Sequence, residues 1–359
     1  MKIGILTYHK SHNYGALLQA IALRYKLDKM GHEVFFIDYW PRYHRQMYSL
    51  FSLSYALSGG KKKFLNYMKS SVLHFKERKD RICSFKKFIK EYIVPYCIPY
   101  SNVEHLDVMV YGSDQIWRKQ PGLSNQFNPV YFAQNILSAS KHISYAASMG
   151  VAHLDNEDYK NLKRMLSNFS SVSVREQSLH ETLDKINVKS DVALDPTLLL
   201  SAREWDALLP IPFLRKGNYI LYYRLLEGSF DERAIREFAN KQNCHLIILD
   251  SAVREKKENV ISIANPLTFL SLVKYANFVF TSSYHGLVFS LIFEKQFCAS
   301  FITNKERAES LLKEIGLEDR LLQTGETTIT VDSEIDYAKV NPKIEALRKH
   351  SMDFLTQSL

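Results

Sequence analysis

Cysteine is scarce in this sequence and forms no metal-binding or redox motif. Cys83, Cys97, Cys244 and Cys298 are scattered through 359 residues without C-x-x-C spacing. A structural zinc site normally needs clustered cysteine and histidine ligands, and a disulfide scaffold needs many more cysteines. We therefore expect free, buried thiols in a reducing compartment and no bound metal.

Long apolar runs are absent as well. The longest, at residues 286–293, is too short to span a bilayer, and the apolar run in the first ten residues is too short for a signal peptide. Hydrophobic residues make up 46% of the chain and charged residues 24%, a balance typical of globular proteins. We expect a cytoplasmic protein of about two domains.

The common nucleotide, metal and hydrolase motifs are missing. The chain contains no G-x-G-x-x-G fingerprint, P-loop, H-E-x-x-H, G-x-S-x-G, D-x-D pair or EF-hand loop. The missing glycine fingerprint argues against a nicotinamide-dependent dehydrogenase. Without a nucleophile elbow, nothing supports serine hydrolase chemistry.

Positive charge is concentrated in one segment. Residues 40–90 contain 13 Lys and Arg against two acidic residues, a net charge of +11. Because the whole chain has a net charge of +9, the remaining residues together carry −2. The segment is also rich in aromatic residues: Trp40, Tyr43, Tyr48, Phe51, Tyr55, Phe64, Tyr67 and Phe75. This composition suits an anionic membrane surface or a lipid-diphosphate head group. The alternative is a solvated helical face over an ordinary core, and nucleic acid is not expected because no nucleic-acid motif accompanies the charge.

Hydrophobic periodicity predicts two α/β series. Strands at 2–8 and 32–39 flank a helix at 16–31, a βαβ unit that predicts a parallel sheet. The other expected strands of the two series are at 106–114, 141–150, 170–176, 190–200, 218–226, 244–251, 260–264, 277–280 and 296–301. We predict two Rossmann-like, doubly wound domains facing a cleft, a GT-B-like arrangement. The expected parts are an N-terminal domain at 1–200 with a basic helical insertion at about 40–95, a C-terminal domain at 217–335 and a closing helix at 336–359.

Polar residues follow four of the predicted strands, where ligands bind in open α/β sheets. They are the loop and helix start with Asn13, Gly15 and Gln19, the turn with Ser113, Asp114, Gln115 and Trp117, Arg175, and the turn with Ser283, Tyr284 and His285. A helix start with a nearby glycine suits a phosphate or carboxylate, an arginine can hold either group, and a histidine can act as acid or base. Each also has a structural alternative: a capped turn, a helix N-cap, an ion pair of Arg175 with Glu176 or Glu181, or a structural histidine. Asp195 and Pro196 are interpreted mainly as a turn.

At these places the sequence resembles the polysaccharide pyruvyltransferase family. The matching stretches are ILTYHKSHNYGALLQA, YGSDQIW, ISYAASMG, VSVREQSL, ALDPTLLL and TSSYHGLVFSLI, in family order from the first strand to about residue 301. The resemblance implies phosphoenolpyruvate as the donor and no metal or redox cofactor. It also implies a pyruvate ketal product, often across O4 and O6 of a hexose, in capsular or exopolysaccharide pathways.

The resemblance also implies roles for individual residues. His285 matches the family's catalytic histidine, Arg175 its donor-binding arginine, and Asp114 a strand-end aspartate that we assign to acceptor positioning or base catalysis. We expect Asn13, Gly15, Gln19, Ser283 and Tyr284 to contribute to donor binding, and Ser113, Gln115 and Trp117 to contact the acceptor sugar.

One residue departs from the family pattern. Some relatives have an arginine two residues before the histidine, where this chain has Ser283. Arg224, on a predicted strand of the second domain, or a lysine of the basic segment are the candidates to replace that charge. A GT-B glycosyltransferase using a nucleotide sugar, and a non-catalytic scaffold of a polysaccharide assembly complex, are the alternative functions.

Overall fold

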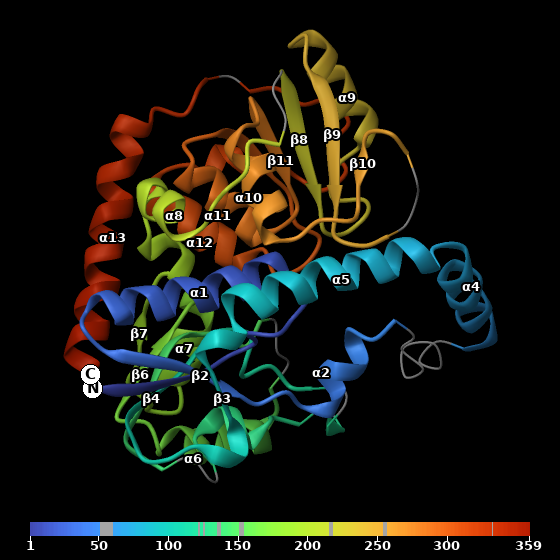
Figure 1. Cartoon of the computed structure of the whole chain (residues 1–359). Helices are drawn as coiled ribbons and strands as arrows, with labels where there is room; N and C mark the ends of the chain where they lie inside the picture. Colours follow the sequence, from blue (N-terminus) through green and yellow to red (C-terminus); the bar gives the residue numbers. More distant parts are fainter. Residues whose placement is uncertain are drawn as a thin grey trace.

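The computed structural model describes residues 1–50, 60–120, 123–124, 126–134, 138–150, 154–214, 218–253, 257–331 and 333–359. It contains two parallel sheets, which confirm the predicted α/β fold class (Figure 1). In the first sheet the strand order is β3-β2-β1-β4-β5-β6-β7, and in the second it is β10-β9-β8-β11-β12. Phe51 and Tyr55 of the basic segment lie outside the described residues.

The strands of the first sheet are β1 (Lys2–Leu6), β2 (Glu33–Asp38), β3 (Cys97–Pro99), β4 (Leu106–Asp114), β5 (Ala139–Ala147), β6 (Ser171–Val174) and β7 (Asp191–Val192). Those of the second are β8 (Tyr219–Arg224), β9 (His245–Asp250), β10 (Val260–Ile261), β11 (Phe278–Thr281) and β12 (Gln296–Ala299). The α-helices are α1 (Tyr14–Lys29), α2 (Arg42–Met47), α4 (Gly60–Leu73), α5 (Phe75–Tyr92), α6 (Asn156–Leu166), α7 (Gln177–Asp184), α8 (Ala202–Leu208), α9 (Glu232–Lys241), α10 (Pro266–Lys274), α11 (Tyr284–Ile292), α12 (Glu306–Ile315) and α13 (Tyr337–Ser358). The 3-10 helices are η1 (Val94–Tyr96), η2 (Tyr100–Asn102), η4 (Pro129–Phe132), η5 (Pro196–Leu199) and η6 (Glu318–Arg320).

The element predictions need two corrections. The expected strand at 190–200 ends after Val192, because the Asp195 side chain accepts from the N–H of Thr197 and Pro196 opens the 3-10 helix η5. The short edge strand β3, which pairs with β2, was not predicted from the sequence. The insertion at 40–95 is helical as expected over α2, α4 and α5.

Both sheets are covered on two faces, as in doubly wound folds. Alternate residues of the first sheet pack with α1 and α5 on one face and with α6 and α7 on the other. In the second sheet, α10 and α11 lie on the face toward the first sheet, and α9 lies on the opposite face. One continuous core therefore runs from the first sheet through α1 to α10 and α11 (Figure 1).

Helix α1 is buried on nearly every side because it lies between the two halves. Twelve of its sixteen residues are buried, which explains why its sequence YGALLQAIALRYKLDK lacks one clear polar face. At its start the Tyr14 ring stacks on Phe85 of α5 and on Phe269 of α10, with centroids 5.3 and 5.2 Å apart. Arg81 of α5 donates to the Tyr14 hydroxyl at 3.1 Å and to the Ser262 carbonyl at 2.8 Å. Through Tyr14, helix α1 thus contacts both the insertion and the second half of the molecule.

This packing predicts different effects for two substitutions of Tyr14. Tyr14→Ala removes the ring that both Phe85 and Phe269 stack on and should lower the free energy of unfolding by about 3–5 kcal/mol. Tyr14→Phe removes only the hydroxyl that accepts from Arg81 and should cost about 1 kcal/mol. Urea unfolding followed by circular dichroism measures both, with Tyr25→Ala, a half-buried tyrosine on the same helix, as control. Equal shifts for Tyr14→Ala and Tyr25→Ala would contradict this account.

Candidate active site

The residues 281–286, TSSYHG, form a strand end, a turn and a helix start. The Thr281 hydroxyl accepts from the backbone N–H of Ser283 at 3.1 Å, which closes the turn after β11. Helix α11 begins at Tyr284, so His285 lies in its first turn with 11% of its side chain exposed. The histidine predicted to be catalytic therefore lies at the carboxyl end of a strand in the second sheet.

Arg175 and His285 meet at one carboxylate, that of Asp195. Arg175 follows β6 and donates from Nη1 to Oδ2 of Asp195 at 2.6 Å. His285 Nε2 lies 3.4 Å from the same oxygen, and the Thr197 hydroxyl donates to Oδ1 at 2.7 Å. Asp195 has no exposed surface and the Arg175 side chain is 1% exposed. A buried ion pair in the first half is thus joined to the histidine of the second half.

Burial and charge act in opposite directions on this pair. Burial alone would raise the pKa of Asp195, but His285 and Arg175 lower it well below its usual range. Burial would also lower the pKa of Arg175, but the neighbouring carboxylates, Asp195 first among them, more than offset it and raise this pKa. Both shifts favour the charged forms of the two side chains.

Asp114 extends this charged group along the edge of the first sheet. It is the last residue of β4, has a φ of 78°, and its Oδ1 accepts from the N–H of Gln115 at 2.8 Å. Its Oδ1 also lies 3.9 Å from Nη2 of Arg175. We refer to Asp114, Arg175, Asp195 and His285 together as the strand-end network. It brings together three of the residues singled out in the sequence, Asp114, Arg175 and His285.

The start of α1 contacts the histidine directly. A Cβ on Gly15 would lie 2.0 Å from Nδ1 of His285, so only glycine permits this approach. Asn13 is the N-cap of α1, and its side chain accepts from the N–H of Ala16 at 3.2 Å. In this structure the imidazole, and not open space, lies beside Gly15. The predicted donor contacts of Asn13 and Gly15 stay predictions.

Three predicted ligand contacts have to be corrected because the side chains lie in the core. Gln19 is fully buried and donates to Thr7 Oγ1 and the Ala16 carbonyl, both at 2.9 Å. Ser113 is fully buried and donates to the Ala146 carbonyl at 2.8 Å, and Trp117 is fully buried with its indole N–H bonded to the Tyr131 carbonyl at 2.9 Å. The physical reasons differ: Ser113 alternates with Asp114 on β4 and so points to the other face, Gln19 lies on a helix that is buried on nearly every side, and Trp117 packs in the core after the end of β4.

Arg224 is held by carboxylates of the second half. Its Nη2 donates to Asp250 at 2.6 Å and its Nη1 lies 3.4 Å from Glu232. Ser283 occupies the N-cap position of α11 and makes no capping hydrogen bond with its side chain. The assignment of Arg224 to donor binding stays a prediction.

Three residues of this region were missed in the sequence: Asp195, Glu176 and Arg307. Arg307, near the start of α12, lies with Cζ 5.0 Å from the centre of the Tyr284 ring, while Arg175 lies 5.6 Å from the same ring. Arg307 Nε is 3.7 Å from Glu176 Oε1, which also accepts from the Ser148 hydroxyl. Burial, and then the nearby charge of Arg175, lower the pKa of Arg307. The Asp-Pro turn was a signal for Asp195, but nothing in the sequence placed Arg307 next to Tyr284.

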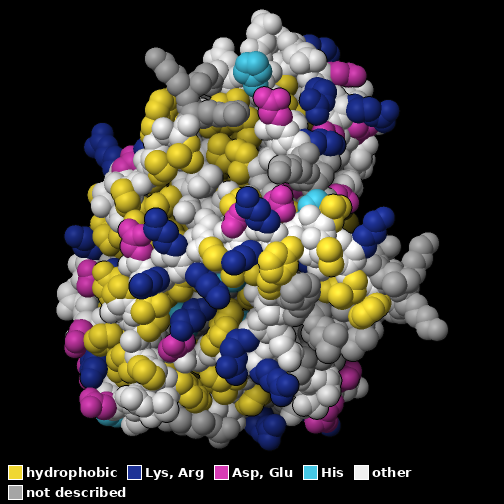
Figure 2. Space-filling view, turned by 45° about the vertical axis from the view of Figure 1, so that its right-hand side comes forward, with side chains coloured by type: hydrophobic (Ala, Val, Ile, Leu, Met, Phe, Trp, Pro, Cys, Tyr) yellow, Lys and Arg dark blue, Asp and Glu magenta, His cyan; other side chains and the backbone are white. Residues whose placement is uncertain are grey.

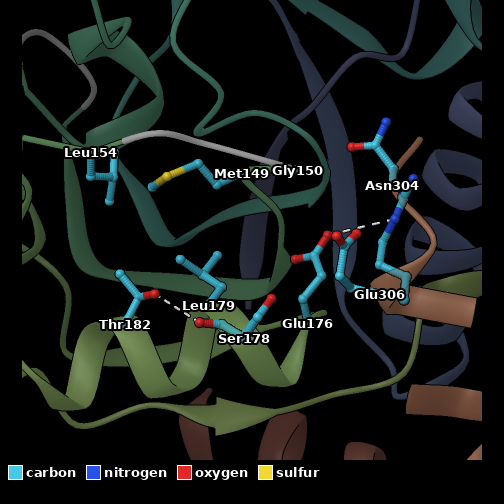
Figure 3. A pocket seen from close by; sticks show the side chains of 10 residues that line it. Met149, Gly150, Leu154, Glu176, Ser178, Leu179, Thr182, Asn304 and Glu306 are labelled. Carbon is cyan, nitrogen blue, oxygen red and sulfur yellow. Dashed lines mark hydrogen bonds and ion pairs between the residues drawn. The ribbon is translucent and has the colours of Figure 1, made fainter. Parts of the chain in front are cut away.

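A pocket of about 210 Å³ opens beside these residues (Figure 3). Its walls come from both halves of the molecule: the segment after β5, the start of α7, and the start of α12 with the residues before it. The lining residues are Met149, Gly150, Leu154, Glu176, Ser178, Leu179, Thr182, Asn304, Glu306 and Arg307. Among the described residues, no group of three His, Cys, Asp or Glu side chains could hold a metal ion.

Two parallel sheets with a charged network between their strand ends describe an α/β protein with a candidate site shared by its two halves. The sequence places it more narrowly: the family profile of the polysaccharide pyruvyl transferases matches residues 13–300. The chain belongs to this family, and it is a transferase. No curated protein sequence gives a significant match.

Solved structures with a similar course of the chain are distant in sequence. A UDP-GlcNAc 2-epimerase from Methanocaldococcus jannaschii is 12% identical over 96% of this chain and 92% of its own, with a TM-score of 0.44. A glycosyltransferase from Rickettsia africae is 10% identical over 98% and 93%, with a TM-score of 0.43. The glycosyltransferase SnogD from Streptomyces nogalater is 13% identical over 99% and 96%, with a TM-score of 0.40.

The contact of Gly15 with His285 predicts that Gly15→Ala lowers the transferase rate by about 100-fold, because the new methyl group displaces the imidazole. Gly31→Ala is the matched control. Gly31 has a φ of 85°, and no atom lies within 4 Å of the position of an added methyl group. We expect this change to lower the free energy of unfolding by only about 1 kcal/mol. Steady-state rates of both variants, measured well below their melting temperatures, test the prediction. Equal rates in the two variants would contradict it.

Proposed function

We propose that this enzyme transfers the enolpyruvyl group of phosphoenolpyruvate onto two hydroxyls of a hexose, forming a pyruvate ketal. The expected product is a 4,6-ketal on galactose or a similar sugar of a lipid-linked saccharide, in capsular or exopolysaccharide biosynthesis. Membership in the polysaccharide pyruvyl transferase family supports the reaction class. The observation that carries the proposal is the convergence of Arg175 and His285, from different halves, on the buried Asp195.

The donor needs cationic and N–H contacts for its carboxylate and phosphate. Arg175 supports this role because its Nε and Nη2 have no hydrogen-bond partner among the described residues, although its Nη1 is bonded to Asp195. A buried guanidinium with free N–H groups is suited to bidentate contact with a carboxylate or phosphate. Tyr284, whose ring lies near both Arg175 and Arg307, and Ser283 complete the expected donor side.

The reaction requires balanced proton transfers. A proton adds to C3 of the enol phosphate, and C2 becomes an oxocarbenium-like centre. The first sugar hydroxyl bonds to C2 and loses its proton, the C2–O bond to phosphate breaks, and the second hydroxyl closes the ketal and loses its proton. One proton thus ends on C3 and one is released with phosphate. We assign the proton transfers to His285 and Asp114, with Asp195 orienting the imidazole and stabilising its charged form.

The reaction is tested with the full chain and a panel of lipid-linked mono- and disaccharides. We expect phosphate release from phosphoenolpyruvate and, by mass spectrometry, a sugar product that has gained one pyruvate ketal. His285→Ala should lower the rate by at least about 100-fold, whereas His245→Ala, an exposed histidine on β9, should not.

Other outcomes distinguish the alternatives. No phosphate release with any acceptor, together with thermal stabilisation by a nucleotide sugar, would favour a glycosyltransferase. No activity and no stabilisation by either donor would favour a scaffold. Full activity of His285→Ala would show that another residue transfers the proton.

We also propose that the enzyme works at the cytoplasmic membrane face, held there by the junction of α4 and α5. Four apolar side chains at this junction are exposed: Met68, Val72, Leu73 and Phe75. Exposed lysines lie beside them at positions 69, 76 and 79. In Figure 2, which turns this side of the molecule forward, Lys and Arg side chains lie next to hydrophobic ones. Apolar groups flanked by lysines complement an anionic lipid surface.

Among the described residues no helix has the length and apolar character needed to cross a bilayer, so the proposed contact is peripheral. The exposed fractions of Val72 and Leu73 are 71% and 69%, and their replacement should not disturb the core. We expect the double variant Val72→Glu, Leu73→Glu to lose most of its flotation with anionic liposomes. Phe213→Glu, at an exposed apolar residue of the other half, is the control and should float like the unmodified protein. Failure of the unmodified protein to float even at low salt would contradict the proposal.

A further inference from the structure

The pocket beside Tyr284 is separate from the free N–H groups of Arg175 but lies next to them. Glu176, in its wall, directly follows Arg175 in sequence, and Arg307, also in its wall, lies against the ring of Tyr284, the neighbour of His285. Arg307 Nε lies 3.7 Å from Glu176 Oε1. Figure 3 shows Glu176 at one side of the pocket, with Ser178, Leu179 and Thr182 from α7 along another. A molecule in this pocket would be close to the strand-end network without displacing it.

Two buried polar atoms in the pocket walls indicate the chemistry of its occupant. Glu176 Oε2, an acceptor, and Arg307 Nε, a donor, are both buried and have no hydrogen-bond partner among the described residues. Glu176 as a whole is 4% exposed. A hydroxyl group can donate to the carboxylate and accept from the guanidinium, so it satisfies both atoms at once. Leaving them unsatisfied would cost free energy, which a hydroxyl-bearing ligand recovers.

The remaining walls fit a neutral sugar better than an anion. Glu176 and Glu306 place two carboxylates at the pocket, which disfavours a phosphate or carboxylate ligand. Met149, Leu154 and Leu179 supply an apolar wall suited to the C–H face of a pyranose ring. Ser178 and Thr182 add hydroxyls near the rim. Polar groups around an apolar wall are the usual composition of a site for a neutral polyol.

The position of Gly150 links the pocket to the predicted acceptor residue Gln115. Gly150 has a φ of 65°, and a Cβ there would lie 2.8 Å from Nε2 of Gln115 and 3.3 Å from Oδ1 of Asn304. Gln115 is therefore the one residue of the predicted acceptor group that lies close to this pocket, whereas Ser113 and Trp117 are buried in the core.

We propose that this pocket is the acceptor subsite and that it holds a neutral hexose, with Glu176 and Arg307 binding one of its hydroxyls. The proposal rests on the proposed function, since it assigns the second substrate of that reaction to a place distinct from Arg175. It makes Arg307 a specificity-determining residue for the sugar.

Ser178→Phe tests the assignment because Ser178 is exposed on α7 and its side chain lines the pocket, so the new ring would fill the space without entering the core. Gln177→Phe is the matched control, one residue earlier on the same helix, exposed and outside the pocket. With the acceptor identified by the phosphate-release assay, we expect Ser178→Phe to raise the KM for the acceptor at least tenfold and to leave the KM for phosphoenolpyruvate within twofold. Arg307→Lys should raise the acceptor KM in the same way, without the added bulk.

A binding measurement separates this proposal from the reaction itself. Saturation-transfer NMR with octyl β-D-galactopyranoside should give a signal from sugar protons with the unmodified protein and with Gln177→Phe, and should lose it with Ser178→Phe. This result would support the pocket even if no phosphate were released, in which case only the proposed function would fail. An acceptor KM unchanged in Ser178→Phe, a raised KM for phosphoenolpyruvate instead, or a sugar signal that is absent from the unmodified protein or persists in Ser178→Phe would overturn the assignment.

Discussion

The buried carboxylate of Asp195 is the constraint on which the arrangement of the two halves depends. A carboxylate with no exposed surface is tolerated only when cations and N–H or O–H donors surround it, since an unpaired buried charge costs several kcal/mol. Arg175 and Thr197 donate to this carboxylate from the first half, and Nε2 of His285 approaches it to 3.4 Å from the second half. The two sheets cannot separate at this point without exposing or unpairing the charge. The ion pair therefore serves packing and the site together.

The approach of the histidine to Asp195 in turn depends on the start of α1. Because Gly15 has no side chain, α11 can place the imidazole against the backbone of α1, and Tyr14 at the same turn stacks between α5 and α10. Helix α1 thus sets the distance between the first sheet and α11. Three consecutive residues therefore have three roles: Asn13 caps the helix, Tyr14 makes the aromatic contacts, and Gly15 leaves space for the histidine.

Most of the fold could be predicted from the sequence because its signals are local. Apolar runs followed by helical spacing identified the βαβ units, and polar residues after the strands singled out Asp114, Arg175 and His285, which the structure brings near one another. The errors arise where the role of a residue depends on the direction of its side chain or on its contacts with segments distant in sequence. Trp117 and Ser113 stand in the same motif as Asp114 but point into the core, and the short motif does not encode that difference. Asp195 looked like a turn residue because its partners are 20 and 90 positions away.

The departure at Ser283 illustrates the same limit and shows how charge is distributed in the site. Arg224, the candidate for a substitute cation, pairs with Asp250 and Glu232. Two cations lie next to Tyr284, Arg175 of the first half and Arg307, which reaches the ring from α12.

Sixteen buried side-chain atoms have no hydrogen-bond partner within the described part of the chain, and five of them belong to four residues around Tyr284: Arg175, Glu176, His285 and Arg307. Since a protein normally satisfies its buried polar groups, this group of atoms supports the proposal that substrates bind here. The atoms without a partner are donors on Arg175, an acceptor on Glu176 and a donor on Arg307. This difference is consistent with the proposed binding of an anionic donor beside Arg175 and of a neutral acceptor beside Glu176.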